Sequence, residues 1–308
     1  MKKLLCLLFA LMLAGFAAQA ESNDWTFNYD DYKLTAYQGA GGAVVIPEEL
    51  DGCTVDILGL NLFNDADDVT SLTLPSTLKQ VEENVASFCD NLTELVIPEG
   101  VTAIPKHAFR NSKVEEVILP ESLTAIGNYA FDCSSLKSIT LPDSVTTLGN
   151  YALASCKSLK TVSLSENLTT VGSYAFAYSS GLTEITIPDS VTSLGEYAFW
   201  ECDGLEKITV GEGVTKLSRY AFYGCTGLTE VTLPDTLVTI YSYAFENCTS
   251  LETIHIPDSV TEIGEYAFFE CESLSDVYYG GTTTQKQNIT IGANNEDLEE
   301  ATWHCQRQ

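Results

Sequence analysis

Residues 182–204 read LTEITIPDSVTSLGEYAFWECDG, and the chain repeats this stretch over about two thirds of its length. Nine such units follow one another between Val69 and Ser273, each opened by Leu or Val. They are 23 residues long except for two units of 22 residues, at Leu92 and Val114, which are shortened after their Ala-Phe pair. Periods of this length indicate a solenoid, in which each unit buries its apolar side chains against its neighbours.

The pattern within one unit predicts its local structure. Leu182, Ile185 and Ile187 alternate with polar residues, as in a half-buried strand. Pro188 follows and ends the strand, because proline cannot donate a ladder hydrogen bond. Two further apolar residues and a glycine lead to the Tyr-Ala-Phe segment at 197–199, which we expect to be a short helical or 3₁₀ turn.

Cysteine recurs at position 21 of most units. Ser179 replaces it once, and we expect Cys133 to belong to the same column, displaced by a shortened unit. Exported proteins often use cysteine in disulfides, but pairing needs a specific geometry between neighbouring coils. No zinc-type ligand spacing is present. We therefore interpret the column as buried free thiols that act as small hydrophobes. Its members are Cys89, Cys156, Cys202, Cys225, Cys248 and Cys271.

The first residues predict export. Residues 1–20 contain two lysines, an apolar stretch from Leu4 to Ala17 and a final Ala-Gln-Ala, as in a secretory signal peptide. Phe16 stands where a lipobox would need cysteine, and the Leu-Pro-Ser-Thr at 74–77 is explained by the repeat rather than as a sortase signal. No later apolar run is long enough to span a membrane. We expect a secreted, extracellular or cell-surface protein without membrane insertion.

The formal net charge of −28 disfavours nucleic acid and anionic membranes as partners. Part of this charge forms a column at position 8, where a diffuse Ca²⁺ atmosphere is one interpretation and a solvated acidic edge is the other. We favour the solvated edge, since no calcium-binding loop or repeat is present. No metal or cofactor is expected. The column contains Glu99, Glu121, Asp143, Glu166, Asp189, Glu212, Asp235 and Asp258.

Position 19 differs between units, and its aromatic residues gather in the last third of the repeat. It contains Arg110, Asp132, Ala154, Ala177, Trp200, Tyr223, Glu246 and Phe269. Aromatic rings beside Glu201, Glu246 and Glu270 are suited to stacking on sugars or anchoring a protein. The alternative is that these rings merely cover the convex side of the loops. The candidate ligand-binding residues are Tyr178, Trp200, Tyr223, Tyr241 and Phe269.

Other columns carry weaker functional signals. The outward position 5 is rich in threonine, as in ice-binding surfaces, but ordinary β-propensity explains it better. The tyrosine of Tyr-Ala-Phe is as periodic as the core, and we interpret it as structural. For catalysis, the pair His304 and Cys305 is unsuitable, because adjacent strand residues point to opposite faces. No phosphate loop, dinucleotide fingerprint or zinc motif is present, so we expect no enzyme.

The consensus LxxIxIPxSVTxIGxYAFxxC resembles the BspA-like leucine-rich repeats, also called the Treponema pallidum type. The resemblance implies a leading segment at 21–43, repeats at 44–273 and a C-terminal cap at 274–308. It further implies an α/β-type leucine-rich-repeat solenoid, a horseshoe or arc of stacked 23-residue units with one parallel β-sheet, capped at both ends.

Members of this family are typically exported, and some resemble adhesins. We therefore expect a non-enzymatic binding protein for an extracellular protein or glycan. A structural, self-associating envelope protein is the alternative, and a hydrolase is a minor one.

Overall fold

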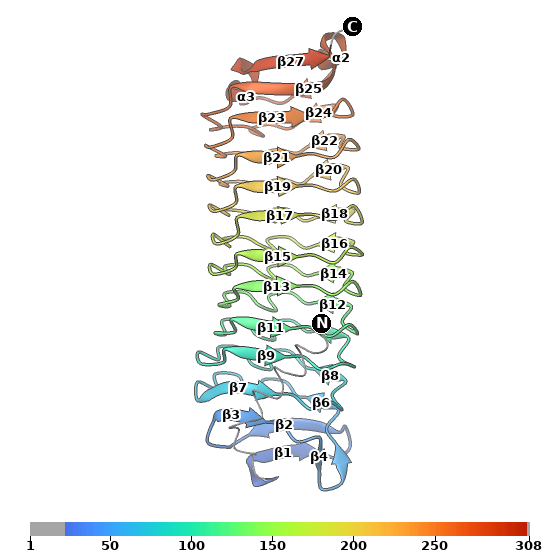
Figure 1. Cartoon of the computed structure of the whole chain (residues 1–308), viewed down its shortest axis with the longest axis vertical. Helices are drawn as coiled ribbons and strands as arrows, with labels where there is room; N and C mark the ends of the chain where they lie inside the picture. Colours follow the sequence, from blue (N-terminus) through green and yellow to red (C-terminus); the bar gives the residue numbers. More distant parts are fainter. Residues whose placement is uncertain (1–21, 307–308) are drawn as a thin grey trace.

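The computed structural model describes residues 22–306, so the predicted leader at 1–20 lies outside the described residues. Each repeat unit forms one coil, and the coils stack in a single column (Figure 1). Equivalent residues of adjacent coils pair in parallel register, as Ile185 does with Ile208. The fold is therefore the predicted parallel solenoid of leucine-rich repeats.

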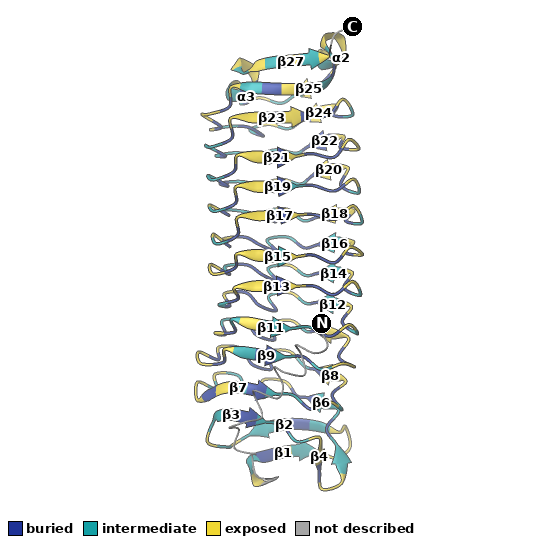
Figure 2. Cartoon of the chain, viewed as in Figure 1, coloured by how far each residue is buried: buried dark blue, intermediate teal, exposed yellow. Residues whose placement is uncertain are grey.

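The first strand of each coil forms a ladder along one side of the column, and its middle members alternate exposed and buried residues (Figure 2). A proline follows eight of these strands, as the sequence predicts, whereas Ser165 and Gly211 stand in its place in two coils. The strands of this ladder are β3 (Gly42–Val45), β7 (Val69–Thr73), β9 (Glu94–Val96), β11 (Glu116–Ile118), β13 (Ser138–Thr140), β15 (Thr161–Ser163), β17 (Glu184–Thr186), β19 (Lys207–Thr209), β21 (Glu230–Thr232), β23 (Thr253–Ile256), β25 (Asp276–Thr282) and β27 (Thr302–Gln306).

A second ladder of shorter strands runs beside the first, whereas we expected one sheet only (Figure 1). Most of these strands are two residues long, and two residues are too few to show the alternation that predicts a strand. They are β2 (Lys33–Tyr37), β6 (Ile57–Leu58), β8 (Gln80–Val81), β10 (Ala103–Ile104), β12 (Ala125–Ile126), β14 (Thr147–Leu148), β16 (Thr170–Val171), β18 (Ser193–Leu194), β20 (Lys216–Leu217), β22 (Thr239–Ile240), β24 (Glu262–Ile263) and β26 (Thr290–Ile291).

The Tyr-Ala-Phe segment forms the third side of each coil and is a turn rather than the expected helical or 3₁₀ segment. Tyr197 and Glu201 have φ of 60° and 51°, in the left-handed region, which interrupts a right-handed helix. Alternate amides bond to the next coil instead, since Tyr129 N lies 2.9 Å from Asn150 O and Phe131 N lies 2.9 Å from Ala152 O.

The ends of the column depart from the repeat. At the first end lie a 3₁₀ turn η1 (Ser22–Asp24), β1 (Trp25–Asn28) antiparallel to β2, and the hairpin of β4 (Glu49–Leu50) with β5 (Cys53–Thr54). At the other end, α2 (Thr283–Lys286) and α3 (Glu296–Glu300) flank β25 and β27. Neither α-helix in residues 22–306 is long and apolar enough to cross a membrane.

The position-21 column is buried, but Cys133 is exposed and does not belong to it. Ser134 occupies the buried place in that coil, 3.3 Å from the Sγ of Cys156. Our placement of Cys133 was wrong because the missing residue falls after position 21, so Cys133 keeps position 20. The cysteines of the described chain are all free thiols.

Candidate ligand-binding surface

Seven tyrosines from successive coils stack in a column that we call the tyrosine ladder: Tyr129, Tyr151, Tyr174, Tyr197, Tyr220, Tyr243 and Tyr266. Consecutive ring centroids lie 4.5 Å apart, or 5.0 Å between the last two, and their planes agree within 7°. The rings are half-buried. Burial, with the neighbouring Tyr151 and Tyr197, raises the pKa of Tyr174 to about 12.

The ladder tyrosines all have a left-handed backbone, with φ between 56° and 65°. This conformation costs a bulky residue about 1 kcal/mol, whereas asparagine adopts it more readily. Asn84 occupies the same place in an early coil with φ 54°, and His107 occupies it with φ 59°. Ring stacking over the repeated 4.5 Å spacing offsets this backbone strain in the later coils.

Trp200 packs on the side of the ladder and contacts four other aromatic rings. Its centroid lies 5.6 Å from Tyr174, 5.4 Å from Tyr197, 5.3 Å from Tyr178 and 6.0 Å from Tyr223. The indole Nε1 is buried and has no hydrogen-bond partner among the described residues. Tyr178, Trp200 and Tyr223, which we call the Trp200 cluster, therefore form one contiguous aromatic surface with the ladder.

The other two sequence-predicted residues lie outside this cluster. Phe269 contacts the ladder at Tyr266, with centroids 5.4 Å apart and planes at 79°. Tyr241 has no ring contact among the described residues and is half-buried where most coils have glycine. That place is tight, since a Cβ added to Gly195 would lie 2.3 Å from the Ser173 backbone nitrogen.

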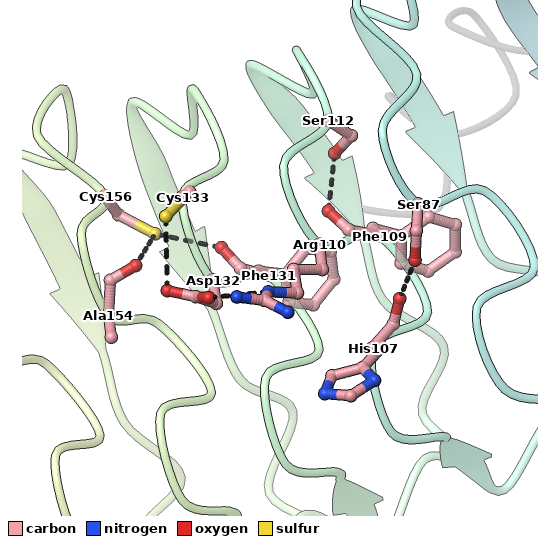
Figure 3. A network of polar contacts seen from close by, with 10 residues as sticks. All are labelled: Ser87, His107, Phe109, Arg110, Ser112, Phe131, Asp132, Cys133, Ala154 and Cys156. Atoms are coloured by element: carbon pink, nitrogen blue, oxygen red, sulfur yellow. Dashed lines mark hydrogen bonds and ion pairs between the residues drawn. The ribbon is translucent and has the colours of Figure 1, made fainter. Parts of the chain in front are cut away.

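A guanidinium covers the ladder near its beginning. The Cζ of Arg110 lies 5.4 Å from the ring centroid of Tyr129, and its Nε donates to the Oδ2 of Asp132 at 2.9 Å. Figure 3 shows the Arg110 and Asp132 side chains pointing toward each other beside Cys133. Both residues occupy position 19, in consecutive coils, so this position accommodates a partly buried ion pair against the ladder.

Glu246 occupies position 19 near the other end of the ladder. It is half-buried, and burial together with the nearby Glu270 raises the pKa of its carboxyl group. In residues 22–306, no Lys, Arg or His forms an ion pair with it. Position 19 thus carries a carboxylate that is paired with Arg110 at Asp132. At Glu246 it carries a carboxylate that has no ion-pair partner among the described residues.

The acidic column at position 8 is exposed, and its carboxylates accept hydrogen bonds from the following coil. The amide of Glu212 donates to the Oδ1 of Asp189 at 2.9 Å, and the amide of Asp235 donates to the Oε1 of Glu212 at 3.4 Å. These carboxylates therefore accept from the position-8 amides of the next coil. The described chain brings no three His, Cys, Asp or Glu residues together as a metal site.

The outward position 5 continues into a stack that the sequence did not predict. Tyr278 lies between His255 and His304, with centroids 4.8 and 4.7 Å away. The Nε2 of His304 lies 2.6 Å from the Oδ1 of Asp276, and this hydrogen bond lowers the pKa of Asp276. The sequence could have revealed only part of this stack, because His255 and Tyr278 are one 23-residue repeat apart whereas His304 follows Tyr278 by 26 residues.

The comparison with known protein families agrees with this architecture. The BspA type leucine rich repeat region matches residues 56–183 and 169–296, in six copies. The chain belongs to the BspA type leucine-rich repeat family. The comparison with curated proteins finds no match.

Solved structures similar to this BspA type chain come from several bacteria. A leucine-rich repeat protein from Bacteroides ovatus is 25% identical over 92% of this chain and 98% of its own, with a TM-score of 0.47. A leucine rich cell surface protein from Faecalibacterium prausnitzii is 25% identical over 86% and 95%, with a TM-score of 0.43. The T. pallidum leucine rich repeat protein is 19% identical over 88% and 94%, with a TM-score of 0.39.

Proposed function

We propose that the chain is an exported, non-enzymatic leucine-rich-repeat protein that recognises an extracellular protein or glycan through the ladder side of its solenoid. The observation that carries the proposal is the Trp200 cluster, in which Tyr178 and Tyr223 contact Trp200 and Trp200 contacts the ladder. These residues interrupt the repeat consensus, so the stacking of coils does not require them.

The chemistry of the cluster suits recognition. Aromatic rings supply large contact areas with little loss of side-chain entropy, and they dominate the energetics of many interfaces. Tyr178 is exposed, whereas Trp200 and Tyr223 are half-buried, so the cluster presents ring surface that is already held in place. A shift of the Trp200 side chain would give its unpartnered indole Nε1 a hydrogen-bond acceptor on a ligand.

The test is binding of residues 21–308 to arrays of extracellular proteins and glycans. We expect Trp200→Ala and Tyr223→Ala to weaken binding by about tenfold or more, as hot-spot aromatics do. Tyr32→Ala is the matched control, because Tyr32 is an exposed aromatic at the other end of the column. Absence of any ligand, or equal binding by all three variants, would refute the proposal.

A further inference from the structure

Asp132 and Glu246 both occupy position 19 of their repeat units, and the two places are structurally equivalent. The amide of Asn111 donates to the carbonyl oxygen of Asp132 at 2.8 Å. In the same way, the amide of Gly224 donates to the carbonyl oxygen of Glu246 at 2.9 Å. The two carboxylates therefore extend from the same point of the coil, each next to the ladder tyrosine three residues before it. What surrounds Asp132 shows what the surroundings of Glu246 can hold.

At Asp132 the chain supplies its own cation. The Arg110 guanidinium reaches across one coil, lies against the Tyr129 ring and pairs with the carboxylate at 2.9 Å. At Glu246 the preceding coil offers Tyr223 in place of the arginine. The carboxylate keeps its place against the ladder, but the cation is missing.

Aromatic rings border this carboxylate from both neighbouring coils. Tyr223 packs against Tyr220 at 5.8 Å, and Phe269 packs against Tyr266 at 5.4 Å, so each leans on the ladder ring of its own coil. Between them, Tyr243 has ring contacts only with its two ladder neighbours among the described residues. Arg110 lies over the Tyr129 ring, whereas no Lys or Arg of the described chain lies over the Tyr243 ring.

The local charge favours a cationic ligand. Burial, and then repulsion from Glu270, raise the pKa of the Glu246 carboxyl group. A sugar hydroxyl can donate to a carboxylate but cannot neutralise the pair. A planar guanidinium donates two parallel hydrogen bonds to a carboxylate, and its positive charge offsets the negative charge. It also stacks on an aromatic ring.

We propose that Glu246, with Tyr223, Tyr243 and Phe269, binds an arginine side chain presented by a protein partner, in the arrangement that Arg110 adopts within the chain. The proposal rests on the proposed function and narrows its ligand to a protein with an exposed arginine. Lysine binds more weakly here, because its ammonium neither stacks nor forms two parallel hydrogen bonds.

The experiment measures binding of acetyl-Gly-Arg-Gly-amide to residues 21–308 by an NMR titration at physiological salt, where long-range charge effects are screened. The matched probes carry citrulline, a neutral isostere of arginine, or lysine. Glu246→Gln should weaken arginine binding about tenfold, and Phe269→Leu about threefold. Glu166→Gln, an equal charge change at an exposed residue of the acidic column, should leave binding unchanged.

Three results would overturn the inference: no binding of the arginine peptide, equal binding of the citrulline peptide, or equal weakening by Glu246→Gln and Glu166→Gln. Circular dichroism melting of each variant confirms that it is folded. A protein or glycan ligand that depends on Trp200 but not on Glu246 would refute this inference and leave the proposed function standing. Arginine binding at Glu246 without any array ligand would support the inference and count against the proposed function.

Discussion

The Sγ of Cys202 lies 3.0 Å from the carbonyl oxygen of Phe176 in the preceding coil, placed for its S–H to donate. Cys225 makes the equivalent contact at 3.2 Å. Where serine replaces cysteine, the Oγ of Ser179 donates to the carbonyl oxygen of Leu153 at 2.8 Å. Position 21 is therefore occupied by a small buried side chain that donates a hydrogen bond, and not merely by a small apolar side chain.

The first prediction concerns this donor. Cys202→Ala removes the hydrogen bond and leaves a small cavity, and we expect a loss of about 1–2 kcal/mol of stability. Cys202→Ser keeps a donor of the kind seen at Ser179 and should lose less. Urea denaturation followed by circular dichroism measures both. A serine variant less stable than the alanine variant would contradict the role of the hydrogen bond.

The second prediction concerns thiol reactivity. Burial raises the pKa of Cys156, Cys202 and Cys271 to about 12, so these thiols carry almost no thiolate at pH 8. Iodoacetamide should therefore modify the exposed Cys133 in the folded protein and leave these three unmodified until denaturant is added. Mass spectrometry of tryptic peptides measures the labelling. Modification of Cys202 in the folded chain as fast as Cys133 would contradict the buried column.

Much of the fold could be predicted because each coil repeats the same signals. The alternation at Leu182, Ile185 and Ile187 and the proline after it predict the first strand and its end. The second strand, Ser193–Leu194, could not be predicted, because its two residues are defined by pairing with other coils. The turn at Tyr197 was also missed, since a left-handed backbone normally indicates glycine or asparagine.

The candidate surface was predictable in part. Departures from the repeat at Trp200 and Tyr223 singled these residues out, and the structure places them together. Their packing against the ladder was not predictable, because it depends on how far each ring leans toward its neighbours. In the sequence, Arg110 and Asp132 are two unrelated variants of position 19. The ion pair between them forms because adjacent coils stack in register.

The third prediction separates backbone strain from ring stacking. Tyr197→Ala loses contacts with two ladder neighbours and with Trp200, which should cost about 2–3 kcal/mol of stability. Tyr197→Asn loses the same contacts but relieves the left-handed backbone, and should cost about 1 kcal/mol less. Thermal denaturation of the two variants measures the difference.

The control for this prediction is Tyr32, which has φ 55° and is 47% exposed. It has no ring contact among the described residues, so Tyr32→Asn should stabilise the protein through its backbone alone. If Tyr197→Asn also stabilised the protein, stacking in the ladder would contribute less than the strain it offsets.

The fourth prediction follows from the raised pKa of Glu246. A carboxyl group whose pKa is higher in the folded state binds its proton more tightly there, so stability falls as pH rises from the unfolded value, about 4.3, through the folded value. Glu246→Gln removes this loss. The variant should therefore melt at a higher temperature than wild type at pH 7 and at nearly the same temperature at pH 3.5.

Glu270→Gln should act in the same direction, because Glu270 contributes to the raised pKa of Glu246. Glu166→Gln, at an exposed carboxylate of the acidic column, should move the melting temperature much less. Calorimetry at the two pH values measures all three variants. A wild-type protein that melts above Glu246→Gln at pH 7 would mean that the carboxylate is already neutralised by a cation, and that the vacant partner position inferred from Arg110 and Asp132 does not exist.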